Sequence, residues 1–308
     1  MRNMAFPLVF LVERVKKREG EKTGCRAFLL TTYSSAPSLL YNKLTLMIKA
    51  LFFDIDGTLV SFNTHEIPQS AVDAIAEAKH RGIGVYISTG RPMRLINNLG
   101  AIEHLIDGYI TATGAYCTIG GREVVRITIP DDEARAFVSE SFAEGFATLV
   151  VGVSDLTVIN PNPDVDRLYR QMLNVSYLGE GVNVEDVLRE GVIQFTPIID
   201  LKAERRLMPM MPGCVSARWY PDFADITARG ADKGTALLTM AARLGIDVSE
   251  TMAFGDGGND KPIISSAGIG IAMGNATDEV KAAADYVTTS VDDDGIRNAL
   301  VHFGVIGG

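Results

Sequence analysis

Continuous apolar runs alternate with helix-like segments along the chain after residue 47. The run "KALFFD" (49–54) lacks the every-second-residue alternation of a half-exposed strand, which is typical of a parallel strand covered on both faces. The next segment, "IPQSAVDAIAEAKHRG" (67–82), predicts a helix, because its apolar residues recur at helical spacing and Gly82 ends it. A second apolar run, "IGVYIS" (83–88), follows. Strand, helix and strand at this spacing predict a βαβ unit.

The pattern changes in the middle of the chain and then returns. Residues 117–129 predict a hairpin that turns at Gly120–Gly121, and residues 130–218 mix helical and strand-like segments. After residue 219 the α/β alternation resumes. We therefore predict an α/β fold, with a Rossmann-like, doubly wound parallel-sheet core made of residues 47–129 and 219–308. Residues 130–218 are predicted to form an inserted α+β cap domain.

The first 46 residues differ from the rest in charge. They carry eight Lys and Arg against three Asp and Glu, which is a net charge of +5. Because the whole chain has a net charge of −9, the other 262 residues have a net charge of −14. The apolar stretch "MAFPLVFLV" (4–12) resembles part of a signal peptide, but it contains Pro7 and charged residues follow it. We interpret residues 1–46 as an N-terminal extension that is poorly ordered, or that lies upstream of a true start at Met47.

Composition narrows the class of protein. With 308 residues, 47% hydrophobic residues and a mean hydropathy of +0.14, the chain is expected to be a globular protein with a sizeable core. No apolar run approaches the ~20 residues of a membrane helix, so we expect no membrane partner. The net negative charge argues against nucleic acid as a partner. Three scattered cysteines favour the cytoplasm, and the four histidines lack zinc-site spacing. Composition leaves the oligomeric state open.

Polar residues follow the predicted strands where each strand ends. Asp54 and Asp56 follow the first strand, Thr89 and Gly90 follow the second, and Asp256 ends a later apolar run. An ordinary turn explains any one of these positions, since Asp and Gly are common in turns. Parallel strands, however, open their carboxyl ends into one crevice, where ligands bind. We therefore expect these residues to converge.

The converging residue types suit phosphoryl transfer. Asp54, Asp56 and Asp256 offer hard oxygen ligands without Cys or His, which favours Mg²⁺ as the cofactor. Thr89 offers a hydroxyl and a backbone N–H to a phosphate oxygen. Lys233, near the start of a predicted helix, offers a cation for phosphate. Metal, cation and anion-binding groups in one crevice are what phosphoryl transfer requires.

Four motifs in order give the chain a family resemblance. The motifs "DIDGTLV", "STGRP", "DKGTAL" and "FGDGGND" together resemble the haloacid dehalogenase-like (HAD) superfamily over residues 47–308. The "TGRP" form, the long insert and the tail "AADYVT…DDDGIRNAL" resemble its Cof-type subfamily IIB sugar phosphatases. The segments "RWYPDFADIT" (218–227) and "TGAYC" (113–117) are similar to those of the bacterial hexose-phosphate phosphatases in that subfamily.

The resemblance implies a role for each aspartate. It makes Asp54 the nucleophile that forms an aspartyl-phosphate, and Asp56 the acid that protonates the leaving oxygen and then activates water. Mg²⁺ would be held by the Asp54 carboxylate, the Asp56 backbone carbonyl and Asp256. An Asp at position 56 favours a phosphatase or a phosphomutase, because relatives with other chemistries lack it.

The resemblance also implies which groups hold the phosphate. Thr89, Gly90, Lys233 and Asn259 are expected around the phosphoryl group, with Asp260 orienting Lys233 from behind. The substrate is expected to be a small-molecule phosphate ester, and a sugar (hexose) phosphate in particular.

The cap is expected to read the leaving group of the substrate. Candidate substrate residues are Arg91, Trp219 and Tyr220, with Arg167, Tyr169 and Arg170 as further cap candidates. Thr113 stands where related sequences often have Asn, so we assign it no role. The alternatives to a sugar phosphatase are a phosphomutase of the same fold and a noncatalytic sugar-phosphate binding protein.

Overall fold

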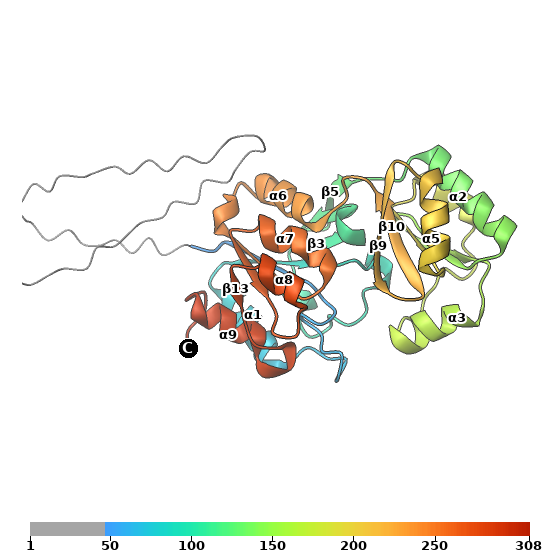
Figure 1. The fold of residues 1–308 in the computed structure, drawn as a ribbon. Helices are drawn as coiled ribbons and strands as arrows, with labels where there is room; N and C mark the ends of the chain where they lie inside the picture. Colours follow the sequence, from blue (N-terminus) through green and yellow to red (C-terminus); the bar gives the residue numbers. More distant parts are fainter. Residues whose placement is uncertain (1–46) are drawn as a thin grey trace, which may run out of the picture. The chain divides into compact units, whose positions relative to one another are not determined.

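The computed structural model describes residues 47–308, which form two β-sheets (Figure 1). The prediction of an N-terminal extension falls on residues 1–46 and so lies outside the described residues. The larger sheet has the strand order β13-β12-β11-β1-β2-β3-β4-β5. Its strands are β1 Ala50–Phe53, β2 Gly84–Ser88, β3 Gly108–Thr111, β4 Tyr116–Ile119, β5 Arg122–Arg126, β11 Thr251–Gly255, β12 Ile269–Ala272 and β13 Tyr286–Val287.

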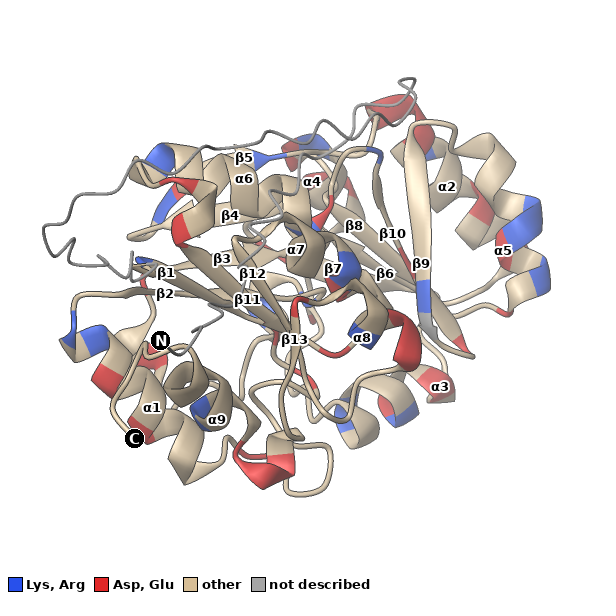
Figure 2. Cartoon of the chain, turned by 60° about the vertical axis from the view of Figure 1, so that its left-hand side comes forward, with Lys and Arg blue, Asp and Glu red and all other residues tan. Residues whose placement is uncertain are grey.

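The strands from β13 to β3 are parallel, and the β4–β5 hairpin adds an antiparallel edge. This confirms the predicted doubly wound core and its hairpin. All four residues of β1 are buried, as expected for a strand with helices on both faces. Figure 2 agrees with this burial, because the charged residues lie mainly on helices and loops and seldom on strands.

Two groups of helices cover the core sheet. On one face α1 packs beside α9, and on the other α6, α7 and α8 follow one another (Figure 1). Within residues 47–308, no helix is both long and apolar enough to cross a membrane. The helices are α1 Gln69–His80, α6 Lys233–Leu244, α7 Lys261–Ser266, α8 Asp278–Ala283 and α9 Gly295–His302.

The smaller sheet forms the cap, with the antiparallel order β7-β6-β8-β10-β9. Its strands are β6 Thr148–Val151, β7 Leu156–Ile159, β8 Gln194–Pro197, β9 Cys214–Tyr220 and β10 Phe223–Ala228. One face packs against helices through an apolar cluster that includes Phe137, Phe195 and Ile226. Those helices are α2 Asp131–Glu144, α4 Val184–Glu190 and α5 Leu201–Leu207.

The expected end of the cap at residue 218 falls inside the β9–β10 hairpin. β10 pairs with β9 and also with β8, so both strands belong to the smaller sheet. We now propose a cap of residues 130–228, since a strand belongs with the sheet whose hydrogen bonds it shares.

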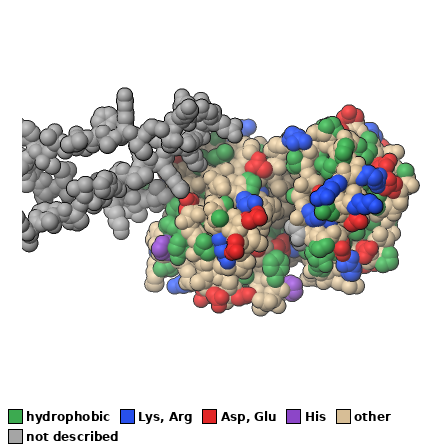
Figure 3. Space-filling view, viewed as in Figure 1, with side chains coloured by type: hydrophobic (Ala, Val, Ile, Leu, Met, Phe, Trp, Pro, Cys, Tyr) green, Lys and Arg blue, Asp and Glu red, His purple; other side chains and the backbone are tan. Residues whose placement is uncertain are grey.

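Basic side chains gather on the cap over α5 (Figure 3). Lys202, Arg205 and Arg206 of this helix are exposed, and Arg206 pairs with Glu140 and Glu144 of α2. The ion pairs therefore join two helices on the outer face of the cap.

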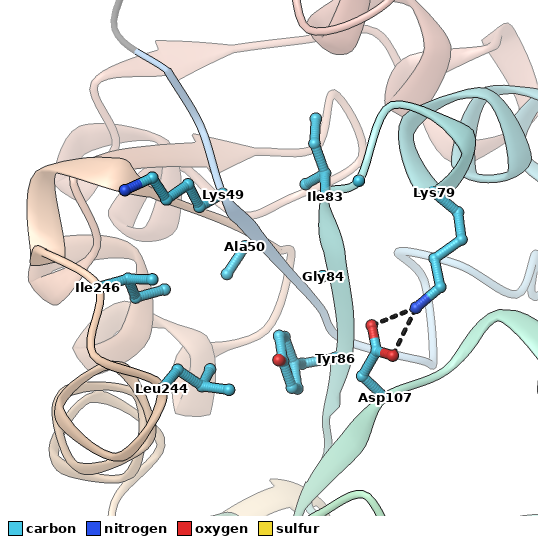
Figure 4. A pocket seen from close by; sticks show the side chains of 10 residues that line it. Lys49, Ala50, Lys79, Ile83, Gly84, Tyr86, Asp107, Leu244 and Ile246 are labelled. Carbon is cyan, nitrogen blue, oxygen red and sulfur yellow. Dashed lines mark hydrogen bonds and ion pairs between the residues drawn. The ribbon is translucent and has the colours of Figure 1, made fainter.

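A hollow of about 400 Å³ lies at the amino ends of β1 and β2 (Figure 4). Lys49, Gly84, Tyr86 and Leu244 line it, and Lys79 beside it pairs with Asp107. The predicted site residues follow the opposite, carboxyl ends of these strands. This hollow is therefore separate from the candidate active site.

Candidate active site

The fold brings the predicted residues together at the carboxyl edge of the core sheet. The Lys233 Nζ, at the first residue of α6, donates to Asp54 Oδ1 at 2.7 Å and to Asp260 Oδ1 at 2.5 Å. Asp54 directly follows β1, and Asp260 lies just before α7. All three side chains are buried, and Lys233 has no exposed surface. Three segments far apart in the sequence thus meet at one buried ammonium group.

The loop after β1 is shaped by Gly57 and tied to Asp256. Gly57 has φ +89°, and a Cβ at this position would lie 2.3 Å from Asp256 Oδ2. Only glycine avoids both the left-handed strain and this collision. The Thr58 hydroxyl donates to Asp256 Oδ1 at 2.9 Å, and the Asn275 amide donates to the Gly57 carbonyl at 2.8 Å. The sequence predicted no role for Thr58 or Asn275.

Asp260 orients its neighbours and has little capacity left for a metal. Its Oδ2 accepts from the backbone N–H groups of Asp256 and Gly257, at 3.1 and 2.9 Å, while Oδ1 accepts from Lys233. One oxygen each from Asp54, Asp256 and Asp260 lies within 4.8 Å of the others. Because both Asp260 oxygens are already engaged, Asp54 and Asp256 are the better candidates for metal ligands.

Negative charge exceeds positive charge at the site. Four carboxylates meet two cationic side chains there: Asp54, Asp56, Asp256 and Asp260 against Lys233 and Arg91. Burial, together with the charge of Asp260, raises the pKa of Asp54 despite the opposing effect of Lys233. Burial and Asp260 likewise raise the pKa of Asp256 to about 7. Burial alone would lower the pKa of Lys233, but Asp260 and Asp54 raise it, so the ammonium stays charged.

This charge excess fits a divalent cation. Carboxylate and carbonyl oxygens are the ligands that Mg²⁺ prefers, and its two charges match the two unneutralised carboxylates. The residues that would hold it are Asp54 and Asp256. The backbone carbonyl of Asp56 stays a prediction. The Asp56 side chain is committed elsewhere.

Arg91 binds the Asp56 carboxylate with both ends of its guanidinium. Its Nε donates to Oδ2 and its Nη2 to Oδ1, each at 2.7 Å, and Nη1 donates to the Leu95 carbonyl at 3.2 Å. Such two-point pairing fixes the plane of a carboxylate. The structure thus pairs Arg91 with Asp56, and the contact with phosphate or sugar stays a prediction.

The loop after β2 uses Thr89 differently from the prediction. The Thr89 backbone N–H donates to the Ile110 carbonyl at 2.8 Å in the sheet, so the prediction that it serves a phosphate is wrong. The Thr89 hydroxyl accepts from the Arg91 N–H at 3.0 Å, which leaves its proton for an anion.

The loop after β3 packs against the Thr89–Arg91 loop of the candidate active site. Ala112 and Thr113 have φ +48° and +54°, a left-handed conformation that is uncommon outside glycine. Their backbone N–H groups donate to the carbonyls of Arg91 and Thr89, both at 3.1 Å. A Cβ on Gly90 would lie 3.3 Å from Asn259 Nδ2 and 3.5 Å from Thr113 Oγ1. Thr113 therefore lies at the site, although the sequence gave no reason to assign it a role.

The cap candidates lie in different places. Tyr220 stacks on Phe223 with ring centroids 5.6 Å apart, while the side chain of Trp219 in β9 is outside the described part of the structure. Arg167 pairs with Asp164 and Asp222, and Arg170 pairs with Asp166 and Glu180, in exposed ion pairs. These two arginines are fixed to the cap surface. Tyr169, between them, is buried.

Known proteins with similar sequences and folds give the family context. The family model described as haloacid dehalogenase-like hydrolase matches residues 51–300. A solved structure described as the HAD subclass IIB sugar phosphatase BT4131 is 44% identical, with a TM-score of 0.78, covering 84% of this chain and 100% of its own.

Two further proteins agree with that context. The solved phosphatase BT1666 from Bacteroides thetaiotaomicron is 36% identical with a TM-score of 0.76, covering 88% of this chain and 100% of its own. Phosphatase YwpJ of Bacillus subtilis (strain 168) is 29% identical over 83% of this chain and 99% of its own length. The similarity thus includes both the core and the cap.

Proposed function

Because the chain belongs to the haloacid dehalogenase-like hydrolase family and is a phosphatase, we propose that it hydrolyses small phosphorylated metabolites, sugar phosphates above all, with Mg²⁺ as its cofactor. The observation that carries this proposal is the position of Asp54. Its carboxylate is buried, held at one oxygen by Lys233, and surrounded by uncompensated negative charge. Such a group suits attack on a phosphorus atom beside a divalent cation.

The first step transfers the phosphoryl group to the enzyme. Asp54 Oδ1 accepts from Lys233, which leaves Oδ2 to attack phosphorus as the ester P–O bond breaks. Lys233 and the Thr89 hydroxyl stabilise charge on the phosphoryl oxygens, and Asp56 protonates the departing alcohol oxygen. A metal ion bound by Asp54 and Asp256 would supply positive charge for the same oxygens.

The second step releases phosphate. Asp56, now a carboxylate, accepts a proton from water as that water attacks the aspartyl-phosphate. The products are inorganic phosphate and the original Asp54 carboxylate, so one phosphoryl transfer to the enzyme balances one transfer to water. Arg91 pairs with the Asp56 carboxylate that accepts this proton, and one of its two hydrogen bonds opens when Asp56 carries the proton for the leaving oxygen.

A sugar-phosphate substrate is supported by the relatives. The HAD subclass IIB sugar phosphatase is 44% identical across both sheets, which makes a sugar phosphate the first substrate class to test here. The scattered, buried free cysteines Cys117 and Cys214 are compatible with the cytoplasmic location predicted from the sequence.

A phosphate-release panel tests the proposal. Hexose, pentose, nucleotide and cofactor phosphates are assayed with Mg²⁺ and with EDTA, using the parent protein, Asp54→Asn and the control Asp73→Asn on the exposed side of α1. We expect Mg²⁺-dependent phosphate release that Asp54→Asn abolishes without lowering Tm, while Asp73→Asn stays active. Transfer to a second sugar with little free phosphate would instead indicate a phosphomutase. Binding without turnover would indicate a sugar-phosphate binding protein.

A further inference from the structure

The second face of the cap sheet packs over the loops of the active site. An apolar cluster joins Leu149 and Val151 of β6 to Leu95, Ala112 and Ala115 of the core. The three core residues come from the loops that follow β2 and β3. Residues that point to this face of the cap sheet are therefore the cap residues nearest to the reacting phosphate.

Four buried polar side chains interrupt this apolar face. Gln194 Nε2 donates to Asp225 Oδ1 at 2.8 Å and to Thr196 Oγ1 at 3.1 Å, and Thr196 Oγ1 donates to the same Asp225 oxygen at 2.7 Å. Tyr169 belongs to the same apolar cluster as Ile193 and Phe223, which are close in sequence to Gln194 and Asp225. Burial, followed by the charge of Asp225, raises the pKa of the Tyr169 hydroxyl, and the Thr196 hydroxyl lowers it. We call Tyr169, Gln194, Thr196 and Asp225 the cap polar cluster; each has less than a tenth of its surface exposed.

Two atoms of the cap polar cluster have no hydrogen-bond partner among the described residues. They are the Tyr169 hydroxyl and Gln194 Oε1, both fully buried. Asp225 fixes the orientation of the Gln194 amide, since a carboxylate accepts only from the NH₂ side. A buried polar group without a partner is costly, so a fold that keeps two of them on one face of the cap sheet has another use for them.

The backbone around Tyr169 is also unusual. Residues Asp166–Met172 form a π-helix that continues from α3 Pro163–Val165. π-helical segments are rare and often occur at functional sites. Here the segment places Tyr169 inward while Arg167 and Arg170 on either side stay in exposed ion pairs.

The cap polar cluster lies directly beside the core site. A Cβ on Gly90 would lie 4.0 Å from Asp225 Oδ2, 3.3 Å from Asn259 Nδ2 and 3.5 Å from Thr113 Oγ1. Gly90 follows Thr89, whose hydroxyl is assigned to the phosphate. A group attached to that phosphate is therefore within reach of the cluster.

We propose that the cap polar cluster binds hydroxyl groups of the leaving group, and that it selects monophosphates whose leaving group carries no second anionic group. The inference rests on the proposed function. The Gln194 carbonyl is an acceptor, and the Tyr169 hydroxyl can donate or accept. The cluster contains no cation, so a neutral polyol satisfies it, whereas a carboxylate or second phosphate meets the charge of Asp225.

Matched substrates test whether the cap polar cluster selects against a second anionic group. Glucose 6-phosphate is compared with 6-phosphogluconate, and fructose 6-phosphate with fructose 1,6-bisphosphate, using p-nitrophenyl phosphate as a substrate without hydroxyls. We expect kcat/KM at least about tenfold higher for the neutral member of each pair. If no ester, p-nitrophenyl phosphate included, is hydrolysed, the proposed function fails. If p-nitrophenyl phosphate is hydrolysed and the anionic member of each pair has a kcat/KM equal to that of the neutral member, the proposed role of the cap polar cluster is overturned while the proposed function stands.

Matched variants test the residues. Tyr169→Phe and Asp225→Asn should each lower the ratio of kcat/KM for glucose 6-phosphate to that for p-nitrophenyl phosphate by about tenfold. Asp225→Asn should in addition narrow the gap between fructose 6-phosphate and fructose 1,6-bisphosphate. Tyr177→Phe is the control, because its hydroxyl is a cap hydroxyl that already donates to Asp155 at 2.6 Å. Its ratio should stay within about twofold of the parent's.

A stability measurement separates binding from structure. Tyr169→Phe removes a hydroxyl without a partner, so its Tm should not fall, whereas Tyr177→Phe loses a hydrogen bond and its Tm should fall. An unchanged substrate ratio in Tyr169→Phe, with a lowered Tm, would show that the hydroxyl has a structural role and would overturn the proposal.

Discussion

At the scale of single residues, Lys233 is the buried cation that offsets the negative charge of the site. It joins Asp54, 179 residues away in sequence, to Asp260, 27 residues away. The sequence placed a cation near the start of a helix and predicted that it would contact phosphate. It could not show that this cation would be completely buried between two carboxylates, because that depends on contacts between distant segments.

Lys233→Met should destabilise the protein by about 3–5 kcal/mol, because it leaves two buried carboxylates without their cation. The free energy of unfolding, measured by urea denaturation in EDTA, checks this. Lys202→Met removes an exposed lysine from α5 and should change the free energy by no more than about 0.5 kcal/mol. Equal effects of the two substitutions would contradict the importance of the buried cation.

Asp256 should make stability depend on pH when no metal is bound. Its pKa is raised to about 7, so the folded protein keeps a proton that the unfolded chain loses near the ordinary aspartate pKa of 3.8. The resulting stabilisation is fully present below pH 3.8 and is lost as pH rises through 7. In EDTA, the free energy of unfolding should therefore fall between pH 5 and 7, roughly the window between these pKa values.

Two controls accompany the pH titration. Asp256→Asn should flatten the slope only in part, because burial also raises the pKa of Asp54. Mg²⁺ should raise stability most at the upper end of the range, where it does not compete with a proton. Stability that rose from pH 5 to 7 in EDTA would refute the assignment of raised carboxyl pKa values.

Arg91→Lys should slow the proton transfers of Asp56. Lysine cannot reproduce the two-point pairing that the guanidinium makes with this carboxylate. We expect kcat for a sugar phosphate to fall about 10- to 100-fold, and kcat for p-nitrophenyl phosphate to fall less, because its leaving group needs less help from an acid. Steady-state kinetics on both substrates checks this. A rise in KM with unchanged kcat would indicate phosphate binding instead.

At the scale of elements, those with strong local patterns were predicted correctly. The apolar centre of "KALFFD" forms β1, and the periodic segment after it forms α1. The hairpin at Gly120–Gly121 also formed as β4 and β5. In each case the local preference and the fold agree, so the sequence alone is informative.

The cap elements were harder to predict. The β9–β10 hairpin turns at Pro221 and Asp222, a typical turn pair, yet its first strand mixes polar and apolar residues. Helix α5 begins after Asp200, whose carboxylate accepts from the Ala203 N–H at 2.7 Å, so an N-cap signal was present. The π-helix at Asp166–Met172 has no comparable local signal and depends on packing within the cap.

Gly57→Ala tests the loop that holds Asp256. It should destabilise the protein more than Gly82→Ala does, and it should weaken Mg²⁺ binding. Both glycines have similar φ, +89° and +85°, but a Cβ at Gly82 meets nothing within 4 Å. Gly82→Ala should therefore cost only the left-handed strain, about 1–2 kcal/mol. Denaturation and Mg²⁺ titration check the difference. Equal losses would show that the collision with Asp256 is relieved at no cost.

At the scale of the whole molecule, the core sheet and the cap sheet contribute different groups to the proposed reaction. The core sheet supplies the proposed nucleophile, the buried cation and the proposed metal ligands, each following a different strand or beginning a different helix. Their convergence was predictable, because parallel strands open into one crevice. The cap supplies the polar cluster that we propose to bind the leaving group. Their positions depend on how β8, β10 and a π-helix pack, which the sequence did not show.

The central claim is that Asp54 carries the phosphoryl group during turnover. Rapid acid quenching of a single turnover, followed by peptide mass spectrometry, tests it most directly. We expect a transient adduct with the mass of one phosphoryl group on the peptide containing Asp54, formed and lost at rates consistent with phosphate release. Phosphate release without any adduct, or with the adduct on a different residue, would contradict the account.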